Sequence, residues 1–291
     1  MIVALLGTGL MGTPMTRRLS TAGHDVHVWN RSPEKAQALS DVATVHESPN
    51  EAVKTAEIVI SMLADGEITR NVLDKQKVID SAPDDATIIN MGSVEPECDK
   101  YLAELALRKN KRYLDAPVSG GVKGAEEATL TILVGGNKED LEAARPVLEA
   151  MGRPNLLGPI GAGQTAKLAN QLIVAITIGA VSEAFKLADS AGCDIAVLQQ
   201  ALQGGFADSR ILELHGKRMV ERDYEPGGRC QSQLKDLNNA MALSAKNKLS
   251  LPLASSVQAS FKNLVEEHDG GELDHSAYYL WLHSQTTQQA K

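Results

Sequence analysis

The sequence IVALLGTGLMGTPM, residues 2–15, places a short aliphatic run directly before a glycine motif. The motif has the spacing G-x-G-x-x-G, and its context, after a strand-length run and before a helix-like segment, favours a dinucleotide site over a glycine-rich turn without a ligand. In such a site the first glycine permits a tight turn, the second lets the backbone approach a pyrophosphate, and the third permits close helix–strand packing. The predicted phosphate cradle consists of Gly7, Thr8, Gly9, Leu10, Met11 and Gly12.

Aliphatic runs alternate with helix-like segments through the first half of the chain. This alternation predicts a largely parallel sheet with helices on both faces. After residues 2–6, the expected strands are residues 26–28, 58–63, 87–91, 113–116 and 130–134, and the main helices are residues 10–22, 96–109 and 138–151.

The pattern changes after Gly163. Residues 164–191 form a long helix that is apolar almost all round, which predicts burial, including burial against another subunit. Further helices are expected at residues 195–202, 232–246 and 253–267. The predicted fold is therefore α/β, with a Rossmann-type dinucleotide-binding domain over residues 1–161 and an all-helical domain over 162–291. We expect a homodimer or homotetramer formed through the helical domain.

Composition excludes several classes of protein. The net charge of −8, from 29 Lys and Arg against 37 Asp and Glu, argues against a nucleic-acid partner. The most apolar stretch, residues 172–181, is about half the roughly 20 residues that a membrane span needs. The three cysteines are far apart and lack metal-ligand spacing. We expect a cytoplasmic protein with no membrane contact and no metal.

The residues after the second strand predict the choice of cofactor. An acidic side chain there would accept hydrogen bonds from the ribose of NAD. This chain has Asn30, Arg31 and Ser32 instead, which could all donate to a 2′-phosphate. NADP is therefore favoured over NAD, the alternative being that Arg31 is a solvated surface residue.

Two further segments carry residues suited to chemistry. The sequence DAPVSGG, residues 115–121, follows a strand and offers the Ser119 hydroxyl and the N–H groups of Gly120 and Gly121 to a small carboxylate. The sequence GAGQTAKLAN, residues 161–170, places Lys167 and Asn170 on one helix face. A cation near a helix N-terminus opposes the dipole, which would ease proton release from Lys167. The alternatives are a loop built for tight geometry and a lysine whose stem packs on the apolar surface.

These motifs, together with KDL at residues 235–237, resemble in order and spacing the β-hydroxyacid dehydrogenase family. The resemblance covers essentially the whole chain. It is specific for the family and less so for the substrate, although the run KLANQLIVAITIGAVSEA is most similar to the tartronate semialdehyde reductase branch.

The resemblance implies a role for each matching residue. Lys167 matches the catalytic lysine, Asn170 an asparagine that holds the substrate, and Ser119–Gly121 the carboxylate-binding loop. Ser93 matches a residue close to the nicotinamide, and Lys235 a lysine that contacts the cofactor. The remaining cofactor-binding assignments are Met62 and Leu63.

Two positions depart from the family pattern. Gly228 replaces an aromatic residue that relatives often carry near the active site, so a wider pocket is expected. Gln171 replaces a second asparagine of the 6-phosphogluconate branch, which argues against substrates of that branch.

The resemblance implies an NADP-dependent oxidoreductase that interconverts a small semialdehyde acid and its hydroxy acid, with Lys167 as general acid and base. Tartronate semialdehyde is the preferred substrate, and 3-hydroxyisobutyrate dehydrogenase or glyoxylate/succinic semialdehyde reductase activity is the alternative. An imine reductase is disfavoured because that group usually replaces the lysine. A non-catalytic NADP-binding protein is disfavoured by the presence of both Lys167 and Asn170.

Overall fold

The computed structural model describes residues 1–289, with side chains through residue 284. The chain divides into two compact units, the first being Met1–Lys167 and the second starting at Leu168. The helix α9, Ala162–Ser190, begins in the first unit and continues into the second. The division therefore falls inside this helix, a few residues after the boundary expected at residue 161.

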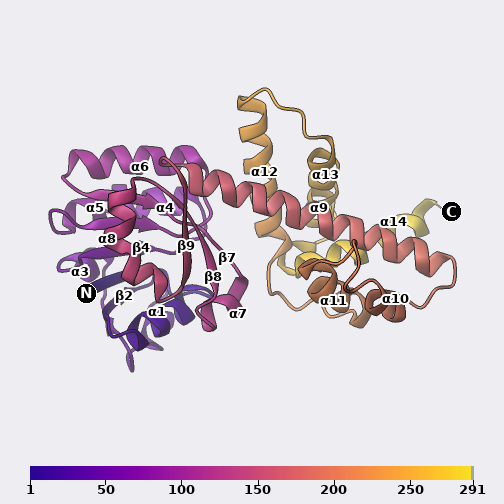
Figure 1. Ribbon diagram of the computed structural model, residues 1–291, viewed down its shortest axis with the longest axis horizontal. Coiled ribbons are helices and arrows are strands. Elements are labelled where there is room, and N and C mark those ends of the chain that lie inside the picture. The colour runs from indigo at the N-terminus through magenta and orange to yellow at the C-terminus, as the bar shows by residue number, and fades with distance from the viewer. Residues whose placement is uncertain (290–291) are drawn as a thin grey trace. The chain divides into compact units, whose positions relative to one another are not determined.

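The first unit is a sheet with helices packed around it (Figure 1). Its elements before α9 are β1 (Ile2–Leu6), α1 (Gly12–Thr21), β2 (Asp25–Trp29), α2 (Pro33–Gln37), β3 (Thr44–Val45), α3 (Pro49–Val53), β4 (Ile58–Ser61), α4 (Gly66–Arg70), η1 (Asn71–Lys75), α5 (Val78–Ser81), β5 (Thr87–Asn90), α6 (Pro96–Arg108), β6 (Arg112–Asp115), β7 (Val118–Ser119), α7 (Gly121–Glu126), β8 (Leu130–Gly135), α8 (Lys138–Glu149) and β9 (Gly152–Gly158).

The strand order is β3-β2-β1-β4-β5-β6-β8-β7, and β9 pairs with β8. Strands β1 to β6 pair with one another in parallel, whereas β8 runs antiparallel to β6 and β7. Alternate residues of β1 enter different cores, since Val3 and Leu5 pack on one face of the sheet and Ala4 and Leu6 on the other. Both faces are therefore covered, as the α/β pattern predicts.

Three strands, β3, β7 and β9, are absent from the sequence prediction. Strands β3 and β7 have two residues each, too few for a recognisable alternation. Strand β9 contains Pro154 and has several exposed residues, and β8 is the one strand with which it pairs. Proline is tolerated in such a strand because an unpaired strand side needs no backbone donor.

The second unit is helical, and residues 168–289 contain no β-strand. Besides α9 it contains α10 (Ile195–Ala201), η2 (Leu212–Gly216), α11 (Lys217–Glu221), α12 (Cys230–Lys246), α13 (Pro252–Glu266), η3 (Gly270–Glu272), η4 (His275–Ala277) and α14 (Tyr278–Gln289). Its core forms around Phe185 of α9, Phe261 of α13 and Leu237 of α12, all fully buried.

Helix α9 is long and apolar enough to cross a membrane if judged by length and composition alone. In this fold, 39% of its most apolar 18-residue stretch is buried, and Ala175, Ile178 and Phe185 belong to the core of the second unit. A core helix passes the same composition test, so the apolar character of α9 is explained in part by packing.

Candidate functional site

The glycine loop between β1 and α1 has the geometry that its spacing predicts. Gly7 has a φ of 108°, and a Cβ there would lie 2.4 Å from the Met62 carbonyl oxygen. A Cβ on Gly12 would lie 1.9 Å from the Gly7 carbonyl oxygen. Both positions therefore exclude any side chain, the first by conformation and contact and the second by close packing of α1 on the loop.

The middle of this loop has room for a ligand. A Cβ on Gly9 would meet no atom within 4 Å. The Thr8 hydroxyl oxygen is buried and has no hydrogen-bond partner among the described residues. Buried polar atoms are usually paired, so an orphan beside an open glycine is the environment expected where a ligand supplies the partner. These residues fit the phosphate groups of a dinucleotide.

The end of β2 lies against this loop. The Asn30 side-chain oxygen accepts a hydrogen bond from the Thr8 N–H at 3.0 Å, and its amide nitrogen donates to the Ser32 carbonyl at 3.0 Å. Asn30 thus holds the glycine loop and the following turn together, a positioning role that the sequence analysis did not predict. Arg31 is exposed, and Ser32 precedes α2. The guanidinium of Arg31 is therefore accessible to an anionic ligand.

Met62 and Leu63 connect two parts of the candidate site. The Met62 carbonyl borders Gly7, while the Leu63 carbonyl would lie 2.6 Å from a Cβ on Gly92. Ser93 follows Gly92 and is half-buried. Residues 62–63 are thus packed between the glycine loop and the loop that carries Ser93.

The predicted carboxylate loop forms a tight turn at the end of β7. Ser119 pairs with Thr131 of β8, and both following glycines have positive φ, 137° for Gly120 and 64° for Gly121. Gly120 and Gly121 are exposed, and a Cβ on Gly121 would meet nothing within 4 Å. The loop is therefore an open backbone turn on which a small anion has access to N–H groups.

The start of α9 is anchored to the end of β6 by Asp115. The two carboxylate oxygens of Asp115 accept hydrogen bonds from the backbone N–H groups of Gly161, at 2.8 Å, and Gln164, at 2.9 Å. Lys167 follows Gln164 by three residues and is half-buried. Asp115 also precedes the Ser119 loop by four residues, so one buried carboxylate fixes the bases of the segments that carry Lys167 and Ser119.

A buried polar network extends behind this anchor. Asp99 of α6 accepts hydrogen bonds from the Asn90 amide at 2.8 Å and the Tyr113 hydroxyl at 2.6 Å. Burial, followed by repulsion from the Asp115 carboxyl, raises the pKa of Asp99 to about 7. Burial also raises the pKa of Asp115, although its backbone donors oppose that shift. Two acidic groups with raised pKa values in one network are a frequent feature of functional sites.

In the second unit, a chain of side-chain amides joins α9 to α12. The Asn170 amide donates to the Gln171 side-chain oxygen at 2.8 Å, and Gln171 donates to the Gln233 side-chain oxygen at 3.1 Å. Helix α12 also carries Lys235, whose ammonium lies 3.4 Å from the Asp236 carboxylate. The structure thus connects predicted residue Asn170 to the helix that carries predicted residue Lys235.

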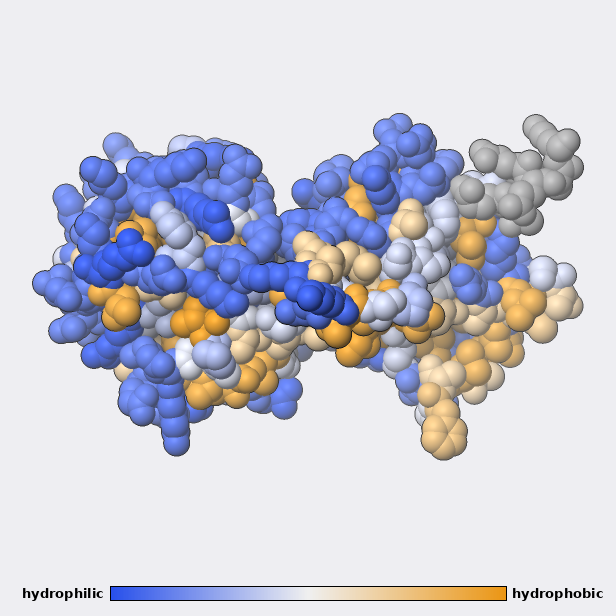
Figure 2. Space-filling view, turned by 90° about the horizontal axis from the view of Figure 1, so that it is seen from above, coloured by the Kyte–Doolittle hydropathy of each residue, from blue (hydrophilic) through white to orange (hydrophobic). Residues whose placement is uncertain are grey.

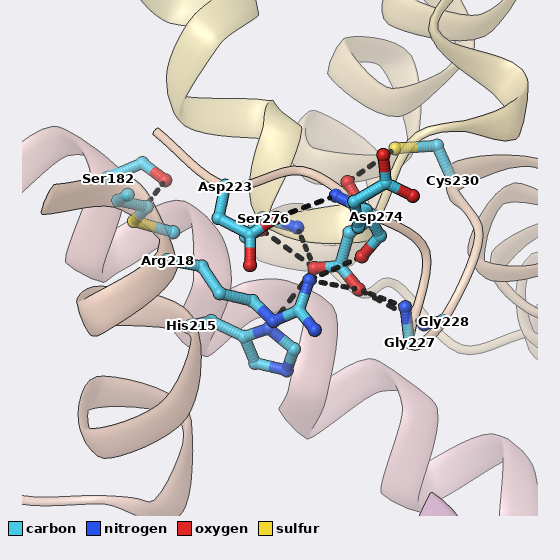
Figure 3. Close-up of polar contacts among 11 residues, drawn as sticks. Ser182, His215, Arg218, Asp223, Gly227, Gly228, Cys230, Asp274 and Ser276 are labelled. Carbon is cyan, nitrogen blue, oxygen red and sulfur yellow. Dashed lines mark hydrogen bonds and ion pairs between the residues drawn. The ribbon is translucent and has the colours of Figure 1, made fainter. Parts of the chain in front are cut away.

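The loop before α12 is organised by Asp274, which is fully buried (Figure 3). Its carboxylate accepts hydrogen bonds from the backbone N–H groups of Gly227 and Gly228, each at 3.0 Å, and from the N–H and hydroxyl groups of Ser276. A Cβ on Gly228 would lie 3.1 Å from the His275 ring. The His275 imidazole therefore occupies the space next to Gly228, and the expectation of a wider pocket there stays a prediction.

His215, Asp274 and His275 place their possible metal-ligand atoms within 4.8 Å of one another. The Asp274 oxygens already accept the four hydrogen bonds described above. The Arg218 guanidinium also lies 3.7 Å from the same carboxylate and would repel a cation. We assign this cluster to anchoring of the loop before α12.

Several residues of these networks escaped sequence reasoning, among them Asp115, Gln164 and Gln233. The first two lie inside motifs that the sequence analysis quotes, but they were given no role. Gln233 precedes KDL by two residues, and a buried glutamine has no local signal that distinguishes it from an exposed one.

Two family models match this chain, each over a different part. The model for the NAD binding domain of 6-phosphogluconate dehydrogenase matches residues 2–169. The model described as NAD-binding of NADP-dependent 3-hydroxyisobutyrate dehydrogenase matches residues 161–282. The two matches together cover both compact units.

Individual relatives agree with these matches. The chain is 40% identical over 279 residues to 2-hydroxy-3-oxopropionate reductase of Escherichia coli strain K12, covering 95% of each chain. It is 33% identical over 280 residues to glyoxylate/succinic semialdehyde reductase 1 of Arabidopsis thaliana, covering 95% of this chain and 96% of the relative. A solved structure of Mycobacterium tuberculosis 3-hydroxyisobutyrate dehydrogenase with L-serine has a TM-score of 0.88 at 33% identity, covering 97% of this chain and 98% of that one.

Proposed function

We propose that this chain, which belongs to the 3-hydroxyisobutyrate dehydrogenase-like β-hydroxyacid dehydrogenase family, reduces tartronate semialdehyde with NADPH. Members of the family are NAD(P)-dependent oxidoreductases that act on CH–OH groups. Tartronate semialdehyde is 2-hydroxy-3-oxopropionate, the compound in the name of the Escherichia coli relative. It carries an aldehyde to be reduced and a carboxylate to be bound.

The observation that carries this proposal is the anchoring of α9 in the first unit. Asp115 fixes the start of the helix, Lys167 follows within the next turn, and the open Ser119–Gly121 turn leaves from the same strand end. A proton donor and a carboxylate-binding turn are thereby attached to one rigid edge of the sheet. Active sites of open α/β sheets form at that edge, outside the carboxyl ends of the strands.

The proposed reaction needs few protein groups because the bound nicotinamide supplies the hydride to the aldehyde carbon. Negative charge then develops on the carbonyl oxygen, and the Lys167 ammonium donates a proton to it, which completes the alcohol. In the reverse direction the neutral amine accepts the hydroxyl proton. The N–H groups of Gly120 and Gly121 and the Ser119 hydroxyl hold the carboxylate throughout.

The proposed preference for NADPH rests on Arg31. Its guanidinium is exposed beside the glycine loop, and the neighbouring Asn30 is a neutral amide instead of a carboxylate that would repel a 2′-phosphate. The roles of Asn170 in substrate orientation and Lys235 in cofactor contact rest on the resemblance, and they stay predictions.

A panel of small acids tests the substrate. Tartronate semialdehyde, succinic semialdehyde, glyoxylate and methylmalonate semialdehyde are each assayed with NADPH and NADH, alongside 3-hydroxyisobutyrate in the oxidising direction. We expect the highest kcat/KM for tartronate semialdehyde with NADPH. A higher value for glyoxylate or succinic semialdehyde would assign the chain to the activity of the Arabidopsis relative instead.

We further propose that the protein is a cytoplasmic homodimer or homotetramer that associates through the second unit. Apolar side chains are exposed there, among them Ile173 and Leu187 of α9, at 68% and 73% exposure. Hydrophobic residues are visible on the molecular surface in Figure 2. Exposed apolar patches mark association surfaces. Sedimentation at micromolar concentration should show a dimer or larger species, and a monomer would contradict this proposal.

A further inference from the structure

Gln164 lies in the first turns of α9 and is fully buried. Its side chain points away from its own helix backbone toward the loop that follows β5. The amide nitrogen donates to the Gly92 carbonyl at 2.8 Å, and the amide oxygen accepts from the Val94 N–H at 3.1 Å. These two backbone groups flank Ser93, so one side chain holds both peptide neighbours of that residue.

The backbone around Gln164 is held equally firmly. Its own N–H donates to Asp115, and a Cβ on the preceding Gly163 would lie 2.3 Å from the Leu133 carbonyl. The start of α9 is therefore packed closely against the end of β6 and against β8, and no side chain fits at Gly163. Gln164 cannot move without displacing either the helix start or residues 92–94.

The Ser93 loop has a second support from the opposite direction. The Asn90 side-chain oxygen accepts a hydrogen bond from the Gly92 N–H at 3.2 Å, and the Asn90 amide donates to Asp99. Asn90 thus fixes the loop to β5 and α6, whereas Gln164 fixes it to α9. The Gln164 contacts join the loop to the helix that carries Lys167.

We propose that Gln164 is a positioning residue for the reaction, setting the place of Ser93 relative to Lys167. This inference rests on the proposed function. Ser93 matches a residue beside the nicotinamide, and Lys167 is the proton donor to the carbonyl oxygen. Hydride transfer and protonation occur at adjacent atoms of one substrate, so the two supporting segments must keep a fixed separation.

An amide is the side chain suited to this position. It donates to a carbonyl and accepts from an N–H at the same time, and it stays neutral at every pH, whereas a carboxylate here would face Asp115 and Asp99. Misplacement of reacting groups by about 1 Å can cost about 10²-fold in rate. The loss of Gln164 should therefore slow catalysis more than it weakens binding.

The test compares Gln164→Met with Gln199→Met. Methionine keeps the length of the side chain and removes its hydrogen bonds. Gln199 is the matched control, because it is also buried and donates to a backbone carbonyl, that of Leu212, at 3.2 Å in the second unit. For Gln164→Met we expect roughly a 10- to 100-fold lower kcat, a KM for NADPH within about twofold, and a larger isotope effect with 4-deuterated NADPH. For Gln199→Met we expect a lowered Tm and an unchanged kcat.

Gln164→Asn answers the same question if Gln164→Met does not fold. Its amide is one methylene shorter and cannot reach Gly92 and Val94 together, so kcat should fall here too. An unchanged kcat in a folded Gln164 variant, or an equal loss in Gln199→Met, overturns the positioning role and leaves the proposed function intact. A wild-type protein that turns over none of the acids overturns both.

Discussion

Asp99 in the first unit and Asp274 in the second unit are both completely buried, and their two carboxyl groups have opposite pKa shifts. The pKa of Asp99 is raised to about 7. The pKa of Asp274 is held well below its usual range. Burial by itself raises the pKa of both groups, so burial does not explain the difference.

The difference lies in the groups that surround each carboxylate. Asp99 accepts hydrogen bonds from two neutral side chains and lies near the like charge of Asp115. Asp274 accepts from three backbone N–H groups and one hydroxyl, and His215 lies 3.4 Å from it. Burial acts against ionisation of Asp274, but the hydrogen bonds and nearby histidines outweigh it.

The two networks also differ in what they support. Asp99 belongs to the network behind the strand ends that carry the candidate catalytic residues. Asp274 ties the loop before α12 to the segment before α14. The polar network of the first unit therefore lies behind the candidate site, whereas the network of the second unit fixes a loop.

The largest expected effect is on turnover, and it is tested by comparing two lysines of α9, Lys167 and Lys186. Lys167→Ala should lower turnover by about 10²–10⁴-fold, because it removes the general acid, while Tm and NADPH affinity change little. Lys186 serves as the control. Its ammonium donates to the Leu282 carbonyl in the second unit, so Lys186→Ala should affect Tm and leave turnover intact. Turnover retained in a folded Lys167→Ala protein would remove the proposed proton donor.

The next effect tests the structural role of Asp274. Asp274→Ala leaves several donors and a nearby guanidinium without their acceptor, and should lower the free energy of unfolding by about 3–5 kcal/mol. Asp223→Ala is the control, since Asp223 accepts one hydrogen bond at the surface of the same loop, from Glu225, and should cost far less. Urea titration measures both. Equal costs would mean that Asp274 is no more important than a surface aspartate.

A smaller effect concerns the cofactor and compares one cation from each unit. Arg31→Ala should weaken NADPH binding by about 1.5–3 kcal/mol and leave NADH binding nearly unchanged, because only NADPH carries the 2′-phosphate. Lys235→Ala should weaken both cofactors alike if it contacts their shared part. Fluorescence titration of each variant with each cofactor provides the measurement. Equal weakening of both cofactors in Arg31→Ala would refute the assignment of Arg31.

The smallest effect is the pH dependence of stability. The folded pKa of Asp99, about 7, lies above its usual value of 3.8, so the folded protein binds more protons between these values. Stability from Asp99 is therefore fully present below about pH 4 and is lost as the pH rises through 7. Asp274 acts oppositely, since its contribution is present above its usual pKa and is lost on acidification.

The Asp99→Asn variant removes the contribution of Asp99 titration to the pH dependence of stability. It should flatten the decline in unfolding free energy between pH 5 and pH 8, a decline on the order of 2–3 kcal/mol, while the loss at lower pH remains. Urea denaturation across this pH range provides the data. An unchanged slope in Asp99→Asn would show that another group titrates.

The candidate site was predictable where the signal is local. Gly7 and Gly12 act through backbone conformation and close contact between neighbouring elements, whereas Gly9 leaves open space for a ligand. The spacing of the three glycines is the local signal for all of these features. The long helix and its Lys167 are likewise visible as an uninterrupted apolar pattern. Strands β3, β7 and β9 were missed because two residues, or a strand with proline and exposed positions, carry no periodicity.

The sequence by itself determined the family, the parallel sheet, the dinucleotide loop and the candidate proton donor. Only the tertiary structure decided how Asp115, Gln164, Asp99 and Asp274 act. A carboxyl group or an amide takes its role from the donors and charges that surround it, and here these come from residues as far as 72 positions away, as in the Gln164–Gly92 hydrogen bond. Local patterns encode backbone shape and burial, whereas protonation and hydrogen-bond pairing arise only when distant segments meet.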